Sequence, residues 1–142
     1  MDEASNQALI LLTALEERRE KLLTLANEFR IAGADNAFLS QGIGCRPFTI
    51  NETQRTREVL GIIFWDISVT PGEGKPFNLD LSVLRDNDKW LVTTGVWSDG
   101  DDEGQDLIQG FPERYAATLE ECWVQVDAAI SDLFTCKKLL TE

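Results

Sequence analysis

The chain begins with apolar residues that recur at the spacing of an α-helix. Between Asn6 and Ala32 they fall three, four or seven positions apart, which places them on one side of a helix. The stripe consists of Ala8, Leu11, Leu12, Leu15, Leu22, Leu25, Ala26 and Phe29. Asp2 or Ser5 can cap the start, and Gly33 is a natural stop. The pattern predicts a helix over about residues 6–32, which packs along a sheet or also pairs with a second subunit.

Three later segments alternate apolar and polar residues, which is the period of a β-strand. They are residues 59–69, 77–83 and 90–97. The first is apolar on both sides at its start and polar on one side from Asp66 onward. A sheet made of these strands therefore has one covered face and one open face, as antiparallel sheets commonly do.

A two-residue turn at Asn87-Asp88 would fix the pairing of the last two strands. Positions whose numbers sum to 175 then face each other. The resulting pairs are Val83 with Val92, Leu79 with Val96, Ser82 with Thr93 and Asn78 with Trp97. Because apolar residues meet apolar ones and most polar residues meet polar ones, we expect this register.

Residues 34–57 have no clear period. Pro47 suits an edge strand, so we expect a short one over residues 46–50. The polar run 51–57 suggests a turn of helix. The only GxG sequence, at residues 42–44, lacks the third glycine of a dinucleotide motif, and we interpret it as a turn.

A second helix closes the chain. Thr118 followed by Glu121 three positions later is a capping box. The apolar stripe after it consists of Leu119, Cys122, Trp123, Val126, Ile130, Leu133 and Phe134. The order of elements predicts an α+β two-layer sandwich, in which both helices cover one face of an antiparallel meander of three to five strands. The covered face is expected to contain the alternate residues of the first strand, Val59, Gly61, Ile63, Trp65, Ile67 and Val69, together with Leu79, Leu81, Val83, Val92 and Val96. Residues 1–142 suit one domain by length.

Charge and composition exclude several functions. Lys and Arg number 13 against 25 Asp and Glu, a net charge of 13 − 25 = −12, and there is no histidine. An acidic surface disfavours direct contact with nucleic acid or an anionic membrane, and favours a basic protein partner. Without histidine, the standard Ser-His-Asp and Cys-His nucleophiles are excluded. We therefore expect no enzyme activity and no cofactor.

Three cysteines, Cys45, Cys122 and Cys136, form neither a disulfide framework nor a zinc motif. The start of the sequence, MDEASNQALILL, lacks the basic region of a signal peptide. We expect reduced thiols and a cytoplasmic location.

An acidic loop follows the third predicted strand. Within residues 98–106 the acids are Asp99, Asp101, Asp102, Glu103 and Asp106. Their spacing partly matches a calcium loop, but Gly110 stands where the bidentate glutamate belongs. Three interpretations stay open for this loop, namely a solvated connection, a docking surface for basic side chains and a weak non-standard Ca²⁺ site.

The open face of the predicted sheet carries the other candidate residues. Asp66 and Asp80 both point to it, and so does Trp97, a large aromatic side chain among small polar ones. An exposed Trp is a typical interface anchor, although a neighbouring layer or subunit could also cover it. The candidate partner-binding patch is therefore Trp97, Asp99, Asp101, Asp102, Glu103, Asp106, Asp80 and Asp66.

These features favour a small acidic module that docks a basic partner. In size and charge it is similar to bacterial immunity proteins and nuclease inhibitors, which implies a partner-binding role. One alternative is a dimeric adaptor, which would be similar to acidic secretion chaperones. Another is a metal-binding protein or enzyme that uses the carboxylates of Asp66 and Asp80.

Overall fold

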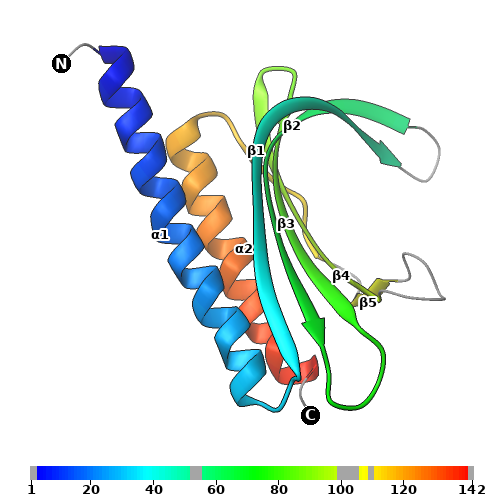
Figure 1. Cartoon of the computed structure of the whole chain (residues 1–142). Helices are drawn as coiled ribbons and strands as arrows, with labels where there is room; N and C mark the ends of the chain where they lie inside the picture. The colour runs from blue at the N-terminus through cyan, green and yellow to red at the C-terminus, as the bar shows by residue number, and fades with distance from the viewer. Residues whose placement is uncertain (1–2, 52–55, 99–105, 109–110, 141–142) are drawn as a thin grey trace.

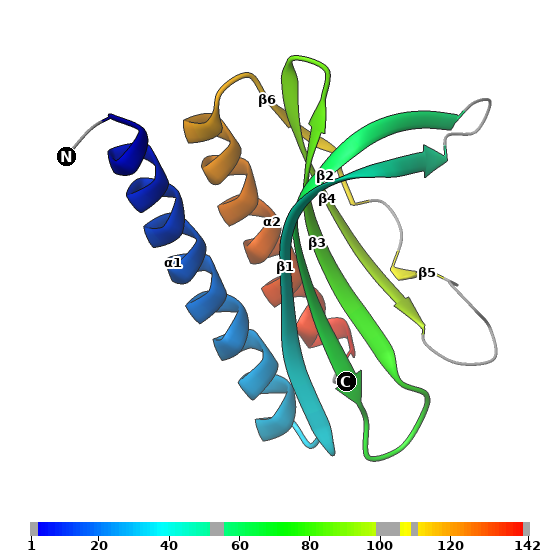
Figure 2. The same cartoon turned by 45° about the horizontal axis from the view of Figure 1, so that its top comes forward.

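The computed structural model describes residues 3–51, 56–98, 106–108 and 111–140. Along the chain the elements are α1 (Glu3–Ile31), β1 (Asn36–Asn51), β2 (Thr56–Thr70), β3 (Phe77–Asp86), β4 (Lys89–Ser98), β5 (Asp106–Ile108), β6 (Arg114–Ala116) and α2 (Leu119–Leu140). The strands form one antiparallel sheet in the order β1-β2-β3-β4-β5, and β6 also pairs with β4. Both helices lie on the same face of this sheet (Figures 1 and 2), so the expected α+β two-layer architecture is confirmed.

Local signals set the ends of the helices. Gly33 has a φ of 112°, a conformation that favours glycine, and the N–H of Ala34 reaches back to the carbonyl of Phe29 at 3.0 Å. At the start of α2 the hydroxyl of Thr118 accepts the N–H of Glu121 at 3.2 Å, as the capping box predicts. The carboxylate of Glu121 accepts the N–H of Ala117, one residue before the cap. In the described part of the chain neither helix is both long and apolar enough to cross a bilayer.

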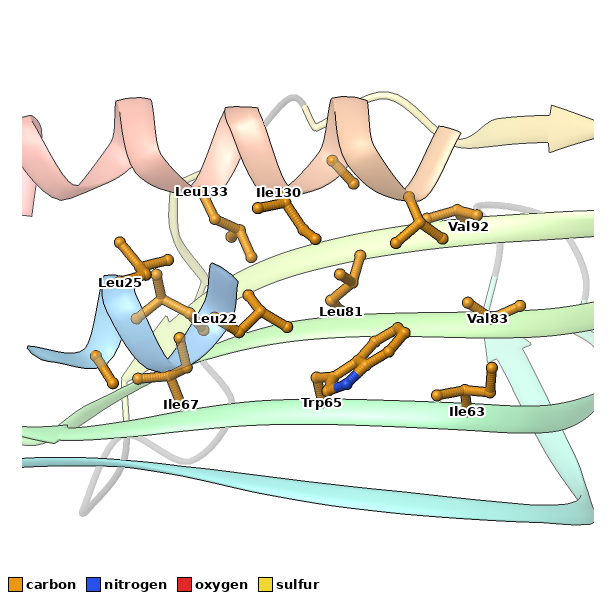
Figure 3. Close-up of a cluster of buried hydrophobic side chains, with 14 of the residues drawn as sticks. Leu22, Leu25, Ile63, Trp65, Ile67, Leu81, Val83, Val92, Ile130 and Leu133 are labelled. Atoms are coloured by element: carbon orange, nitrogen blue, oxygen red, sulfur yellow. The ribbon is translucent and has the colours of Figure 1, made fainter. Parts of the chain in front are cut away.

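The main core lies between the helices and the sheet. Leu22 and Leu25 of α1 and Ile130 and Leu133 of α2 point toward the sheet, where Trp65 is the largest side chain (Figure 3). The sheet contributes Ile63, Trp65, Ile67, Val69, Leu79, Leu81, Val83, Val92 and Val96, all of them buried. Most of the predicted covered face is therefore confirmed.

The β3–β4 register is as expected. Val83 pairs with Val92, Leu79 with Val96, Ser82 with Thr93 and Asn78 with Trp97. Asn87 in the two-residue turn has a φ of 57°, which asparagine tolerates better than most residues.

The first strand differs from expectation. β1 is 16 residues long, whereas the sequence suggested a short edge strand over residues 46–50. It is nonetheless an edge strand, and it contains residues 42–44, which are therefore not a turn. Thr56 and Arg57 belong to β2, and Asn51 to β1, so the expected turn of helix is wrong at these three positions. Residues 52–55 lie outside the described part.

The sheet bends sharply where β1 and β2 break their pairing. The register shifts between Ile43 and Arg46, and again between Gly61 and Ile63 on the β3 side. Such irregularities bend a strand and increase its twist. Beyond them, residues 46–51 and 56–61 curve away from the helices and over the opposite face of the sheet (Figure 1). We call these two segments the hood.

A second, small core lies under the hood. It consists of Val59, Leu84 and Leu91, with Phe64 packed against it. Leu84 and Leu91 alternate with core residues and so belong to the open face, yet both are fully buried. Val59 was expected in the main core. The register shift between Gly61 and Ile63 reverses the alternation of β2, so Val59 lies on the same face as Leu84.

Candidate binding site

The face of the sheet opposite the helices is concave. The hood closes one end of it, and β5 lies at the other (Figures 1 and 2). Under the hood the face is apolar. Farther along the same strands it becomes polar at Asp66 and Ser68 of β2 and at Asn78 and Asp80 of β3. The concave face therefore has an apolar end and a polar end.

Asp66 and Asp80 form the centre of the polar end. They are directly opposite each other in the β2–β3 ladder, so their side chains leave the sheet side by side. Each carboxylate is partly buried. Within the described residues neither carboxylate forms an ion pair with a Lys or Arg. The negative charge of Asp66, so close by, disfavours the ionised form of Asp80.

Trp97 of β4 lies beside this pair of carboxylates. Its indole N–H donates a hydrogen bond to Asp80 Oδ2. Trp97 faces Asn78 directly and Asp80 diagonally, which is within reach of a long aromatic side chain. The expected juxtaposition of Asp66, Asp80 and Trp97 is thus what the structure contains, with Trp97 only partly exposed.

Small polar groups surround the carboxylates. Ser68 Oγ lies 2.9 Å from Asn78 Oδ1 and 3.4 Å from Asp66 Oδ2, and its one hydroxyl proton can serve either acceptor. Asp66 Oδ1 is buried and accepts no hydrogen bond from the described residues. A buried acceptor of this kind has a desolvation cost that a donor on a bound molecule would relieve.

Burial raises the pKa of Asp80 from 3.8 to about 7. A hydrogen bond with Asp66 and the negative charge of Asp66 add to the rise, whereas the indole N–H of Trp97 opposes it. Asp80 therefore still holds its proton in part of the molecules near neutral pH, and an approaching cation would displace that proton.

A small hollow adjoins this site toward the hood. It measures about 140 Å³ and is lined by Gly42, Ile43, Gly44 and Phe64. Gly42 pairs with Phe64, and Phe64 is two residues from Asp66 on the same side of β2. Because the two glycines have no side chain, the hollow can accept a small apolar group next to the carboxylates.

The acidic loop leaves and rejoins the sheet beside Trp97. β4 ends at Ser98, and the backbone of Asp106 pairs with that of Trp97 at the start of β5. Asp99, Asp101, Asp102 and Glu103 lie outside the described residues. The structure therefore brings together Asp66, Asp80, Trp97 and the two ends of the loop.

The sequence did not point to Phe64 or to the glycine-lined hollow. Alternation does place Phe64 on the same face as Asp66, but no pattern in the sequence pairs it with Gly42. In the described residues no group of three or more Cys, Asp and Glu side chains is arranged to hold a metal ion. Comparisons with protein-family models, curated proteins and solved structures find no match to this chain. The chemistry of the site is therefore the guide to its function.

Proposed function

We propose that this chain is an acidic protein-binding module, of the inhibitor or immunity-protein kind, that docks a basic partner on its concave face and the adjoining loop. One observation carries the proposal. Asp66 and Asp80 stand side by side with Trp97 beside them, and no described Lys or Arg of the chain pairs with either carboxylate. Within the described residues, the site has negative charge and an aromatic neighbour but no cation of its own.

A Lys or Arg side chain of the partner would complete this arrangement. Its N–H groups could donate to Asp66 Oδ1, the buried acceptor that receives no hydrogen bond from the described residues. Contact with both carboxylates would offset their mutual repulsion. An Arg would also gain from lying against the indole ring of Trp97, by a cation–π interaction of about 0.5–2 kcal/mol.

The acidic loop and the net charge extend the same preference over a longer range. The loop carries Asp99, Asp101, Asp102 and Glu103, and the whole chain has a charge of −12. Such a field attracts a basic surface and increases the association rate at low salt. In this proposal the loop guides the partner and the concave face fixes its position.

The proposal requires no cofactor, and it places the chain in the cytoplasm. Cys45, Cys122 and Cys136 are all unpaired. Free thiols are usual in a reducing compartment.

Affinity capture from the source organism's lysate tests the proposal. The bait is wild type, an Asp66→Asn/Asp80→Asn variant, or a loop variant with Asp99, Asp101, Asp102 and Glu103 changed to Asn or Gln. We expect one basic protein to be recovered by wild type at low salt, less at high salt, and least by the Asp66/Asp80 variant. The matched control changes Glu73 and Asp88, two exposed acids in turns, to Gln and Asn.

The outcomes separate the parts of the site. Equal recovery by wild type and the Asp66/Asp80 variant would show that the concave face does not bind the partner. Equal recovery by the loop variant would remove the loop. If the Glu73/Asp88 control loses the partner as well, net charge alone explains the binding and the proposed site is wrong.

A further inference from the structure

Helix α1 carries an uncovered stripe that the core does not use. Leu9 and Leu12 are 54% and 59% exposed, and Leu23 is only partly buried. The sequence placed Leu12 in the core stripe, and the structure shows that it faces outward. With Glu16 and Arg19, these residues are spaced 3, 4, 3 and 4 apart, the repeat of a coiled-coil seam. We call Leu9, Leu12, Glu16, Arg19 and Leu23 the outer seam.

The outer seam lies on the side of α1 turned away from α2. Arg18 and Lys21 bind Asp127 of α2 at 2.9 and 3.4 Å, and Glu28 binds Lys137 at 3.3 Å. At about 100° per residue, the seam residues lie roughly 180° around the helix from these three contacts. α1 is the outermost element in both views of the molecule (Figures 1 and 2). A partner helix therefore has access to the seam.

Four of the five residues of the outer seam are complementary to one another when the seam is reversed. The positions of Leu12 and Leu23 sum to 12 + 23 = 35, and those of Glu16 and Arg19 sum to 16 + 19 = 35. The fifth, Leu9, would face position 35 − 9 = 26, where Ala26 is buried in the core. In an antiparallel pair related by a two-fold axis, Leu12 then faces the partner's Leu23, and Glu16 faces the partner's Arg19. Each contact occurs twice, as an isologous interface requires. A parallel pair would instead oppose Glu16 to Glu16 and Arg19 to Arg19.

The position of this axis fits the length of the helix. The paired positions centre on 35/2 = 17.5, and α1 spans residues 3–31, whose centre is (3 + 31)/2 = 17. The two helices would therefore overlap along nearly their whole length. In a heptad repeat the residues that face the partner alternate between the a and d positions. An antiparallel pair therefore places an a position of one helix against a d position of the other.

We propose that a second copy of this chain packs antiparallel against α1 through the outer seam, forming a two-fold dimer. The proposal is independent of the partner-binding role of the concave face. Only three of the five seam residues are apolar, so the interface is modest in size. We expect a monomer–dimer equilibrium in the micromolar concentration range.

Charge reversal at the two polar positions of the seam tests both the contact and its direction. Glu16→Arg gives a chain with Arg at both positions, and Arg19→Glu gives a chain with Glu at both. Sedimentation equilibrium of either variant alone should give the 15.9 kDa monomer at concentrations where wild type is a dimer. An equimolar mixture should restore a particle of twice that mass, because each Arg then faces a Glu.

A swap and a control complete the test. The Glu16→Arg/Arg19→Glu double variant preserves the antiparallel pairing and should dimerise like wild type. Asp88→Arg, in the exposed turn between β3 and β4, should not alter the equilibrium. Far-UV circular dichroism confirms that each variant is folded. A monomeric wild type at about 100 µM, well inside the micromolar range expected for weak specific association, would overturn the proposal. So would a mixture of the two single variants that stays monomeric.

Discussion

Asp66 of β2 and Asp80 of β3 face each other across the ladder, and no described Lys or Arg pairs with either of them. Like charges directly opposite each other destabilise a sheet. The chain limits this cost through a raised pKa at Asp80 and through the indole N–H of Trp97. Binding of a cation could relieve the repulsion that disfavours folding at this pair. The same two residues therefore lower the stability of the free protein and favour binding.

Asp80→Asn should make the protein more stable above neutral pH. The pKa of Asp80 is about 7 in the folded chain against 3.8 ordinarily, so between these values the folded state holds more protons than the unfolded state. Stability from this group therefore falls as pH rises from about 4 to 7 and stays low above 7. Asn cannot ionise and can still donate to Asp66. We expect the Tm of the variant to exceed that of wild type by a few degrees at pH 8, by less at pH 5, and to match it near pH 4.

Thermal melts from pH 4 to 9 measure this effect as the difference between variant and wild type. Asp88→Asn makes the same charge change in the exposed β3–β4 turn and serves as the control. A difference that does not vary with pH, or that has the same size for Asp88→Asn, would contradict the prediction.

Trp97→Phe should raise the pKa of Asp80 further. Phe retains most of the ring but has no N–H to donate to the carboxylate, and that hydrogen bond is what lowers the pKa of Asp80 in wild type. Carboxyl-carbon NMR titration would show the Asp80 midpoint moving above its wild-type value. Trp90→Phe, at an indole against Arg85, is the matched control and should leave the midpoint in place. An unchanged midpoint in Trp97→Phe would show that the indole does not act on Asp80.

Partner binding should release a proton and become tighter with rising pH. A cation at the carboxylates favours the ionised form of Asp80, so affinity should increase from pH 6 to 8 and level off above the pKa of about 7. Calorimetry in two buffers of different ionisation enthalpy counts the protons released. The Asp80→Asn variant should release fewer, and equal release by both proteins would place the cation elsewhere.

Gly61→Ala should destabilise the hood. A Cβ at this position would lie 2.3 Å from Cζ of Phe64, so the ring must move or the strand must shift. Crowding of this kind costs about 1–3 kcal/mol of unfolding free energy. Phe64→Leu should recover part of the loss in the double variant, because the two residues are coupled. Gly42→Ala adds a Cβ with nothing within 4 Å and should cost much less. Urea unfolding provides the comparison.

The native protein should have one fast-reacting thiol. Cys45 is exposed, whereas Cys122 and Cys136 are buried on α2. Burial raises the pKa of Cys122 to about 11 and also raises that of Cys136, and Asp132 adds to the effect at Cys136. Because the thiolate is the reactive form, a disulfide reagent should titrate one thiol per folded chain and three in denaturant. Cys45→Ser should abolish the fast reaction.

The sequence predicted the parts of the fold whose patterns are local. The β3–β4 register followed from a two-residue turn and matched pairs such as Val83 with Val92. β1 was underestimated because Gly42, Gly44 and Pro47 interrupt its alternation and a register shift lies inside it. β5 and β6, at three residues each, are too short to show a period.

Three residues of the candidate site were predicted to share one face, but their geometry was not predicted. Alternation alone placed Asp66, Asp80 and Trp97 on one face. Their contact depends on the β2–β3 register, which is unbroken from Ile63 opposite Val83 to Val69 opposite Phe77. The connection over residues 71–76 is too long for its sequence to fix this register. Leu12 was misplaced for a related reason, since steps of three and four on one helix fit both the core stripe and the outer seam.

The hood has a consequence for the order in which the molecule comes apart. Its cluster of Val59, Leu84 and Leu91 is separate from the main core, so it can open while the helices remain packed on the sheet. We expect backbone amides in residues 46–51 and 57–60 to exchange with solvent before those of Trp65 or Leu81. The hood is then a local folding unit. A ligand bound beneath it would slow amide exchange in the hood without changing amide exchange in the main core.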